Sequence, residues 1–483
     1  MKHTSRPYHD MLLYGSALLL LRGASLITLP VMTYFLSIEQ IGQLELISVT
    51  QIFFSLLIAL AMHENLYRFI ATTQDANEQK AMTSRLYTTS LLLSCGLIIM
   101  VSGLFWTMNL FSNGEVKLQN FSDSQLVLMA SAIAIQGSLE ISLAWLRLQN
   151  RALIFFKISL ICTCLQVGLI LAVVSIIPSV TAVLAVGVFC AFVQMGLLHF
   201  YNRFSWQTLS LEQLKHYLRY CLPIMLSALV AFGLNGGERW LLAQSGDLAL
   251  LAQYAIAIKF ALAMGILLQP FHMWWMPKRF EYWQNQGETT TSYISQYGIV
   301  YACVLALLVT WLGKLFILLF LPSQYQLASD ILALAVVAML CKELAEIVNI
   351  GILKAQKTSQ LFSINLVTTT IAIGCVWLVV LQFPNLALWT VCSGVALAQL
   401  TRCLVILTFS QKSCPLPYQL GKLTCYLLLT FTLIASSWMS DTIVTSILIA
   451  IMETILLVAA AHHLGLLKLP YQNLRRAIVR LSL

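Results

Sequence analysis

The stretch LPIMLSALVAFGLNGGERWLLAQSGDLALLAQYAIAIKFA, residues 222–261, is a long apolar run with a short polar interruption. Only four of its side chains are acidic or basic, namely Glu238, Arg239, Asp247 and Lys259. A helix needs about 20 mostly apolar residues to cross a lipid bilayer. The stretch therefore predicts two consecutive membrane-spanning helices joined by a turn near Asp247.

Similar apolar windows recur along the whole chain of 483 residues, which is 59% hydrophobic and only 10% charged. Soluble domains carry about 25% charged residues, and no long polar stretch remains here for a soluble domain. The first residues, MKHTSRPYHDMLLYGSALLLL, combine a charged start with an apolar run and have no small-residue cleavage site, so we expect an uncleaved first helix. The composition predicts an all-α polytopic membrane protein.

We predict fourteen spanning helices, with twelve as the alternative count because the last two are the weakest. They cover residues 11–36, 42–69, 86–111, 124–148, 153–177, 180–201, 219–245, 248–276, 293–320, 328–353, 361–382, 386–409, 421–440 and 442–464. Lys and Arg favour cytoplasmic loops. With the N-terminus inside, the cytoplasmic segments hold nineteen Lys and Arg residues and the outer loops hold one, Lys117. This pattern predicts cytoplasmic N- and C-termini. It also explains the net charge of +9 by topology and attraction to anionic lipid, without a nucleic acid partner.

Two internal matches indicate a duplication. LEISLAWLRLQNRALIFFKISLI (139–161) aligns with AEIVNIGILKAQKTSQLFSINLV (345–367) at an offset of 206, which places Glu140 on Glu346. IGQLELI (41–47) aligns with LAQYAIA (251–257) at an offset of 210. Six helices separate the copies, so the halves are expected to be parallel repeats. We predict an N-terminal lobe over 1–205, a C-terminal lobe over 206–412, and two added helices with a basic cytoplasmic tail over 413–483.

The twelve cysteines form no CxxC pair and no Cys/His cluster, so we expect them to pack as small apolar side chains. We accordingly expect no metal site and no cofactor. The outer loops, such as QFPN, are too short to build an active site. This argues against an enzyme of the outer face, such as a glycan polymerase.

Ionisable side chains inside the apolar segments are the functional candidates. A charge at mid-bilayer costs about 2.5–3.5 kcal/mol on the insertion scale, so each needs a partner or a wet cavity. The basic candidates are Arg22, Arg239, Lys259, Lys342 and Arg402, and the acidic candidates are Glu64, Glu140, Glu238, Glu343, Glu346 and Glu453. Helical spacing puts several of them in line with small or polar residues, so we expect these faces to turn inward.

Structural alternatives stay open for most of these residues. Lys342 and Glu346 could neutralise each other four residues apart, and Glu140 and Glu346 could be hydrogen-bond anchors within their lobes. Arg402 and Glu453 are expected to pair elsewhere in the bundle. Arg22 and Lys259 have no acidic neighbour one turn away, so for them we favour a functional role. Unpaired cations in a membrane cavity are suited to phosphate or pyrophosphate.

The adjacent pair Glu238–Arg239 raises a separate question. Neighbouring residues on a helix point about 100° apart, so each side chain is expected to need its own partner. Two interpretations stay open. The segment is an outer gate with Arg239 facing a cavity, or it is a structural lock from helix 7 to helix 8 or helix 1.

Five segments in order resemble the Wzx-type oligosaccharide flippases of the multidrug/oligosaccharidyl-lipid/polysaccharide (MOP) exporter superfamily. They are LPVMTYFLSIEQIGQLELI, WLRLQNRALIFF, the opening stretch LPIMLSALVAFGLNGGERWLLAQSGDLALLAQYAIAIKFA, WWMPKRFE and GILKAQKTSQLFSIN. The resemblance covers roughly residues 10 to 410. Two features depart from it: the family more often has Asp-Arg where this chain has Glu238-Arg239, and the two added C-terminal helices are similar to those of peptidoglycan-precursor flippases.

The resemblance implies two six-helix lobes in a V around a central cavity. It implies an undecaprenyl-pyrophosphate-linked oligosaccharide as substrate, moved from the cytoplasmic to the periplasmic leaflet of the bacterial inner membrane. The product would feed O-antigen, capsule or exopolysaccharide assembly, with polymerase and chain-length proteins as pathway partners. In related flippases basic residues of helices 1 and 8 meet the pyrophosphate, and Arg22 and Lys259 lie in those helices here.

We therefore expect a transporter that works by alternating access, with membrane lipid around it and a proton or sodium gradient as a source of energy. The expected cationic substrate site comprises Arg22, Lys259, Lys342 and Arg239. The expected coupling or ion-pair residues are Glu140, Glu346, Glu343, Glu64, Glu238 and Glu453. The rival is a cation-coupled drug exporter of the same fold. Such exporters usually need an acidic residue high in helix 1, and residues 11–36 contain none.

Overall fold

The computed structural model describes residues 23–111, 121–440 and 442–467, and these residues form helices and turns without a strand. The chain divides into two compact units, Met1–Ala252 and Gln253–Leu483. The lobe boundaries predicted from the repeat, after residues 205 and 412, stay a prediction. The basic tail predicted after residue 467 and the outer-loop Lys117 lie outside the described residues.

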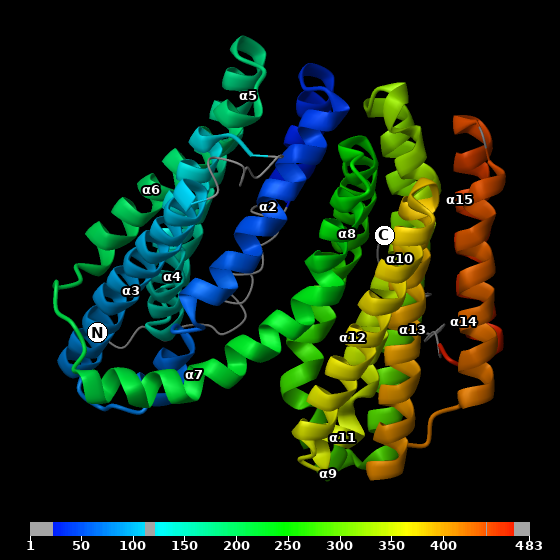
Figure 1. Ribbon diagram of the computed structural model, residues 1–483. Coiled ribbons are helices and arrows are strands. Elements are labelled where there is room, and N and C mark those ends of the chain that lie inside the picture. Colours follow the sequence, from blue (N-terminus) through cyan, green and yellow to red (C-terminus); the bar gives the residue numbers. More distant parts are fainter. Residues whose placement is uncertain (1–22, 112–120, 441, 468–483) are drawn as a thin grey trace, which may run out of the picture. The chain divides into compact units, whose positions relative to one another are not determined.

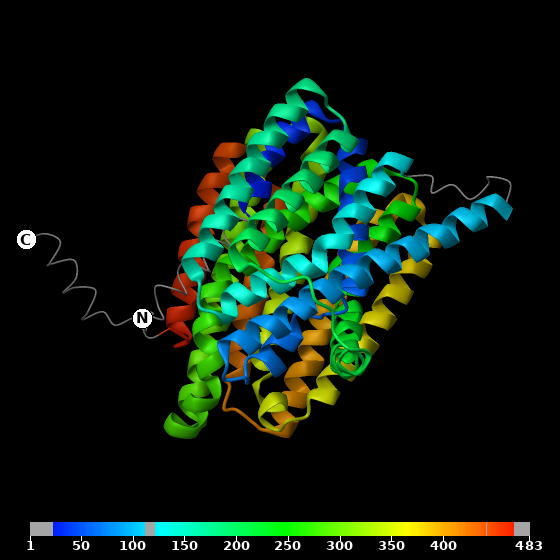
Figure 2. The same cartoon turned by 90° about the vertical axis from the view of Figure 1, so that its left-hand side faces the viewer.

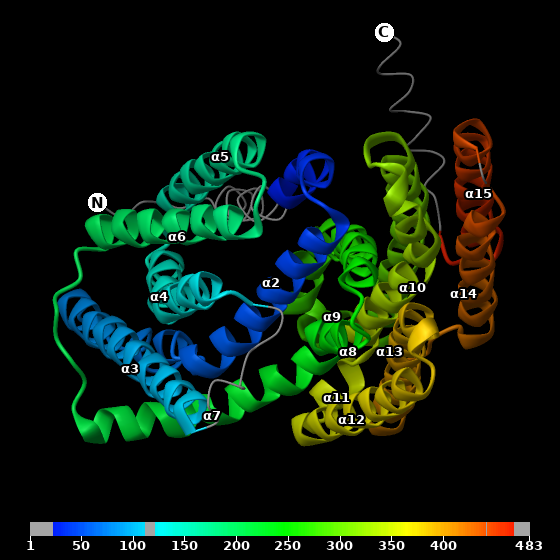
Figure 3. The ribbon, with the colours of Figure 1, turned by 45° about the horizontal axis from the view of Figure 1, so that its top comes forward.

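The first unit is a bundle arranged around α4 (Figures 1 and 3). Its elements are a helix over Gly23–Phe35, α2 (Ile38–Ala59), the π-helix η1 (Leu66–Ile70), α3 (Ala76–Phe111), α4 (Asp123–Leu148), α5 (Ala152–Ile176), α6 (Val180–Asn202), α7 (Leu211–Phe232), the π-helix η2 (Gly233–Gly237), α8 (Glu238–Gln244) and the start of α9 (Leu248–Phe320). α4 packs against α2, α3 and α6. Ser37, Ser122 and Ser210 form capping boxes that fix the starts of α2, α4 and α7.

The second unit packs around α13, which contacts α10 and α12 (Figures 1 and 2). Its elements after α9 are η3 (Ser323–Tyr325), α10 (Gln326–Val348), α11 (Ile350–Lys354), α12 (Thr358–Gln382), η4 (Pro384–Leu386), α13 (Ala387–Ser413), α14 (Leu420–Ala435), η5 (Ser436–Met439) and α15 (Ile443–His463). α14 and α15 pair with each other, and α10 also contacts α14. The two helices added after the repeat are thereby attached to this unit.

The helices confirm the predicted number of spans. Eleven helices of the described residues are long and apolar enough to cross a membrane, judged by length and composition. α9 is counted once among them, but Gly287 leaves the helical conformation at φ +84°, so its 73 residues hold two segments. α10 and the helix at Gly23–Phe35 complete the fourteen predicted helices, the first of them being described only from Gly23.

The backbone supports the internal duplication. Asn150 and Gln356, which lie 206 residues apart, both adopt the left-handed conformation, with φ values of 52° and 57°. α5 and α12 follow these turns and begin and end at positions 206 apart, and α2 and α9 begin 210 apart. A left-handed conformation is unfavourable for residues that carry a Cβ. Its recurrence at one offset therefore reflects a shared architecture.

Helix 2 is interrupted, where the sequence predicts one helix over 42–69. α2 ends at Ala59, Leu60 and Ala61 have φ values of 52° and 50°, and η1 begins only at Leu66. Pro270 stands 210 residues after Leu60 inside α9 and removes one backbone donor there. Both repeats thus disturb the helical hydrogen bonding at the same place, although only the first is broken.

Candidate functional site

Of the two residues favoured for the substrate site, the structure describes only Lys259. Arg22 lies outside the described residues. Lys259 lies on α9 and is half-buried, two residues beyond the buried run Leu251–Ala257. Its ammonium group therefore belongs to a membrane-spanning segment, as predicted. Its part in substrate binding stays a prediction.

Arg239 has its partner on α2. Its Nη1 donates to Glu45 Oε1, and its Nε lies 3.8 Å from Glu238 Oε1. All three side chains are buried. The lock interpretation named helix 8 or helix 1, whereas the structure places Glu45 of helix 2 against Arg239. The neighbouring Glu238 also reaches Arg239, so the two side chains do not depend on wholly separate partners.

A π-helix sets the direction of this pair. η2 immediately precedes Glu238, and a Cβ on its Gly236 would lie 2.4 Å from the Phe232 ring. The rings of Phe53, Phe232 and Trp240 pack with centroids 4.9–5.5 Å apart, and Trp240 Nε1 donates to Thr50 Oγ1 at 3.1 Å. The wider turn rotates α8 relative to α7, and such π segments are frequent at functional sites. Here it directs Arg239 toward α2.

A second ionic cluster lies where helix 2 is interrupted. His63 Nδ1 is 3.1 Å from Glu140 Oε2, and His63 Nε2 is 3.3 Å from Glu64 Oε1. Gln136 Nε2 donates to Glu140 Oε1 at 3.2 Å. Glu64 and Glu140 were predicted coupling candidates, and the structure brings them to one imidazole. His63 was missed, although its position beside Glu64 at the end of an apolar run was a usable signal.

The interruption is tied to α7 by a small buried network. Asn65 Nδ2 donates to Met62 O at 3.1 Å and lies 3.0 Å from Cys221 Sγ. Cys221 Sγ in turn donates to Ala61 O at 3.3 Å. These contacts provide hydrogen bonds to the carbonyl oxygens of Met62 and Ala61, which lie at the interruption of the helix. Within a membrane, such backbone groups need a partner inside the protein. The break is therefore a built feature of the fold.

In the second unit Glu346 is the centre of a larger network. Arg402 Nη2 lies 3.1 Å from Glu346 Oε1, and Asn349 Nδ2 donates to Glu346 Oε2 at 3.1 Å. Arg402 Nε donates to Asn365 Oδ1 at 2.7 Å, and Arg279 Nη1 donates to Asn349 Oδ1 at 3.0 Å. Arg402 thus pairs within the bundle, as the sequence predicts. Lys342 is half-buried one turn away on α10, and its predicted pairing with Glu346 stays a prediction.

Two further acidic candidates have partners on α9. His272 Nδ1 lies 3.5 Å from Glu343 Oε2. Glu453 on α15 accepts from Trp311 Nε1 at 2.9 Å and from Ser436 Oγ at 2.5 Å. Lys314, also on α9, donates to the carbonyl oxygens of Ser437 and Ser440. Glu453 and Lys314 therefore attach the C-terminal helices to α9, which gives Glu453 a structural task.

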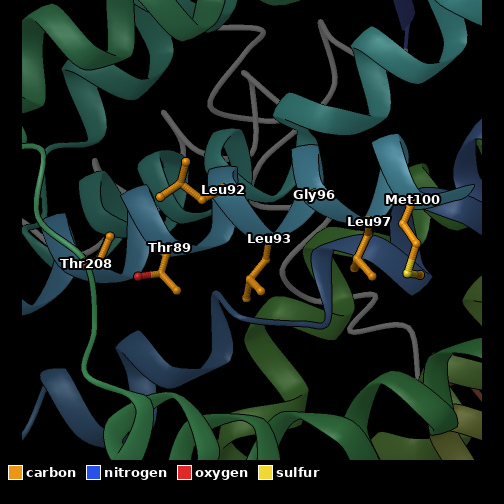
Figure 4. A pocket seen from close by; sticks show the side chains of 7 residues that line it. All are labelled: Thr89, Leu92, Leu93, Gly96, Leu97, Met100 and Thr208. Atoms are coloured by element: carbon orange, nitrogen blue, oxygen red, sulfur yellow. The ribbon is translucent and has the colours of Figure 1, made fainter. Parts of the chain in front are cut away.

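A shallow groove runs along α3 (Figure 4). It is lined by Thr89, Leu92, Leu93, Gly96, Leu97, Met100 and Thr208. Leu93 and Leu97 lie four residues apart and point to the same side of the helix. No residue that lines this groove is ionisable, so its chemistry differs from that of the ionic clusters.

Comparison with known proteins leads to solved structures alone. No protein-family model and no curated protein sequence matches the chain. It is similar to the Lipid II flippase MurJ in an inward closed conformation, with 14% identity over 94% of this chain and 99% of that chain and a TM-score of 0.68. An inward-facing multidrug resistance MATE transporter of the MOP superfamily gives 14% identity, 83% and 96% coverage and a TM-score of 0.57. A mutant of the Vibrio cholerae MATE transporter VcmN gives 13% identity over 84% of this chain and 95% of that chain, with a TM-score of 0.52. The chain is a multi-pass membrane protein with the fold of the MOP-superfamily transporters.

Proposed function

We propose that the protein is a flippase for undecaprenyl-pyrophosphate-linked oligosaccharide units. It moves them from the cytoplasmic to the periplasmic leaflet of a bacterial inner membrane, with both termini in the cytoplasm. The units then enter O-antigen, capsule or exopolysaccharide assembly, where polymerase and chain-length proteins are pathway partners. The observation that carries the proposal is Lys259, a half-buried cation in a spanning helix of a MOP-type fold.

An anionic head group is the ligand that such a cation suits. Within the membrane an ionisable residue marks a functional site by default, because its burial is expensive. Lys259 and Arg22 lie in the helices that meet pyrophosphate in the flippases that this sequence resembles. Lys342 adds a third cation on α10. Arg239 is the fourth cation of the proposed site, and its guanidinium pairs with Glu45.

The similarity to MurJ supports the same substrate class. Its match extends over more of this chain, 94%, than the two MATE matches do, and it has the higher TM-score. The MATE matches support the rival proposal, a cation-coupled multidrug exporter. Residues 11–36 argue against that rival, since they contain Arg22 and no acidic residue.

The double substitution Arg22→Ala with Lys259→Ala tests the flippase proposal. Each lost charge-assisted hydrogen bond weakens pyrophosphate binding by about 1.5–3 kcal/mol, which is roughly tenfold to a hundredfold. We expect surface glycan to fall to the level of a deletion strain while lipid-linked units accumulate. The measurement is surface glycan by gel and lectin staining, in the deletion strain carrying each variant at matched expression.

Two controls define the outcome. Lys157→Ala removes an exposed lysine from α5 and is expected to leave surface glycan unchanged, and Lys259→Arg is expected to keep part of the activity. Normal surface glycan in the double variant at normal expression would overturn the cationic site. Unchanged glycan together with increased drug sensitivity in the deletion strain would favour the exporter.

A further inference from the structure

The groove along α3 has the length of one leaflet of a bilayer. Its lining on this helix runs from Thr89 to Met100, eleven residues further along (Figure 4). At about 1.5 Å per residue this is roughly 16 Å, and half of a hydrocarbon core of about 30 Å is roughly 15 Å. Leu92 and Met100 are 57% and 54% exposed, so the groove can be reached from outside the helix bundle. Its length and apolar lining therefore suit an acyl chain of one leaflet.

The connection between α6 and α7 closes one end of the groove. Thr208, in this connection, lines the groove at the same end as Thr89 (Figure 4). Leu209 N donates to Thr89 Oγ1 at 2.9 Å, and Ser205 N donates to Ser84 Oγ at 3.3 Å. These backbone donors hold the connection on α3. The closed end of the groove is therefore a defined structure and not a loose loop.

A guanidinium group lies at this closed end. Arg85 precedes Thr89 by four residues, so the two side chains share one face of α3. Arg85 Nε donates to Gln207 Oε1 at 3.4 Å, and Gln207 is the neighbour of Thr208 in the connection. An arginine has five N–H donors, of which this contact uses one. Its planar group is well suited to bind a phosphate with two of the others.

The sequence pattern puts this closed end at the depth of the lipid head groups. Arg85 stands one residue before the predicted span 86–111. Trp206 of the connection is 62% exposed and packs against His199, with ring centroids 5.2 Å apart. Tryptophan is enriched where a membrane meets water. The segment 203–219 carries one acidic residue, Glu212, and three basic residues, Arg203, Lys215 and Arg219. This excess of positive charge favours an anionic head group.

We propose that the groove binds one anionic phospholipid. Its phosphate contacts Arg85, and one of its acyl chains runs along α3 from Thr89 past Gly96 to Met100. A zwitterionic phospholipid fits less well, because its head group brings an ammonium to a basic surface. The site contains none of the cations proposed for substrate binding, so it does not depend on the flippase function.

The direct test is photocrosslinking of the full-length protein in phosphatidylcholine nanodiscs that contain a little phosphatidylglycerol with a diazirine in its acyl chain. We expect the label on the part of α3 that lines the groove. Phosphatidylcholine with the same diazirine chain is expected to label it about fivefold less, which is the attraction of one basic residue near a membrane surface. The measurement is mass spectrometry of the labelled peptides.

Two variants separate the head group from the chain. Arg85→Gln is expected to reduce labelling by phosphatidylglycerol about fivefold, to the level of phosphatidylcholine. Gly96→Phe fills the groove and is expected to abolish labelling by both lipids. A Cβ at Gly96 meets nothing within 4 Å, so the larger side chain does not displace protein. The matched controls are Arg151→Gln at an exposed position and Gly168→Phe on α5, where a Cβ also meets nothing within 4 Å. Both are expected to label like the wild type.

Each outcome decides the proposal. Equal labelling of α3 by the two lipids overturns it, and so does a label that Gly96→Phe leaves unchanged. Displacement of the label by undecaprenyl phosphate, but not by excess unlabelled phosphatidylglycerol, would assign the groove to an isoprenoid chain and overturn it as well. If Gly96→Phe does not fold, Arg85→Gln still supplies the comparison. Selective labelling together with normal glycan export in Arg22→Ala/Lys259→Ala would keep the lipid site and reject the flippase site, so the two failures are distinguishable.

Discussion

Arg239→Gln is expected to lower the melting temperature and the yield of folded protein strongly. The substitution leaves Glu45 and Glu238 buried without their guanidinium partner. Breaking a buried ion pair by removing one partner costs about 3–5 kcal/mol, because a desolvated charge remains. The measurement is thermal unfolding of the purified protein, followed by size-exclusion chromatography in detergent.

A double-mutant cycle of Glu45 and Arg239 distinguishes the structural lock from the outer gate. Glu45→Gln combined with Arg239→Gln removes both charges of the pair and is expected to recover part of the lost stability. Arg219→Gln, at an exposed position of α7, is the matched control and is expected to unfold like the wild type. A stable Arg239→Gln variant that fails to export glycan would support the gate instead. Normal export by the charge-swapped variant Glu238→Arg/Arg239→Glu would count against both roles.

Much of the fold could be predicted because membrane helices are encoded locally. Each span is a run of apolar residues, and its length is set by the bilayer. The repeat offset was visible because Glu140 and Glu346 lie in similar contexts, and the turns at Asn150 and Gln356 show that the similarity extends to the backbone. The interruption of helix 2 was missed for a physical reason. Leu60 and Ala61 are ordinary helix formers, and their left-handed conformation depends on contacts with α7.

The ionic partners were predicted far less well. Sequence spacing shows which charges share one helix face, but the two shortest Arg–Glu pairs join different helices. Arg239 with Glu45, and Arg402 with Glu346, are separated by 194 and 56 residues. The predicted pair of Lys342 and Glu346, four residues apart on one helix, stays a prediction, whereas the contact of Glu346 with Arg402 comes from another helix. His63 contacts Glu64 and Glu140, but a histidine, unlike Asp, Glu, Lys or Arg, is not identified as a charged residue by its type alone.

Gly351→Ala is expected to destabilise the second unit strongly. A Cβ at this position would lie 2.2 Å from Ser410 O and 2.7 Å from Cys414 O. Both atoms belong to backbone, so neither can move as a flexible side chain could. Gly351 N also donates to Ser410 Oγ at 2.9 Å, a contact that holds α11 against α13. Separating these helices loses that bond and the packing beside it, and overpacking of this kind typically costs about 1–3 kcal/mol or more.

Gly374→Ala is the matched control. Gly374 lies on α12, and a Cβ there would meet nothing within 4 Å. Alanine is favoured over glycine inside a helix by roughly 0.5–1 kcal/mol, so this variant is expected to melt at or slightly above the wild-type temperature. Tryptophan fluorescence during thermal unfolding compares the three proteins. If Gly351→Ala melts together with Gly374→Ala, α11 and α13 do not approach as closely as the structure shows. A larger loss in Gly351→Leu than in Gly351→Ala would in turn show that the contact limits the size of the side chain.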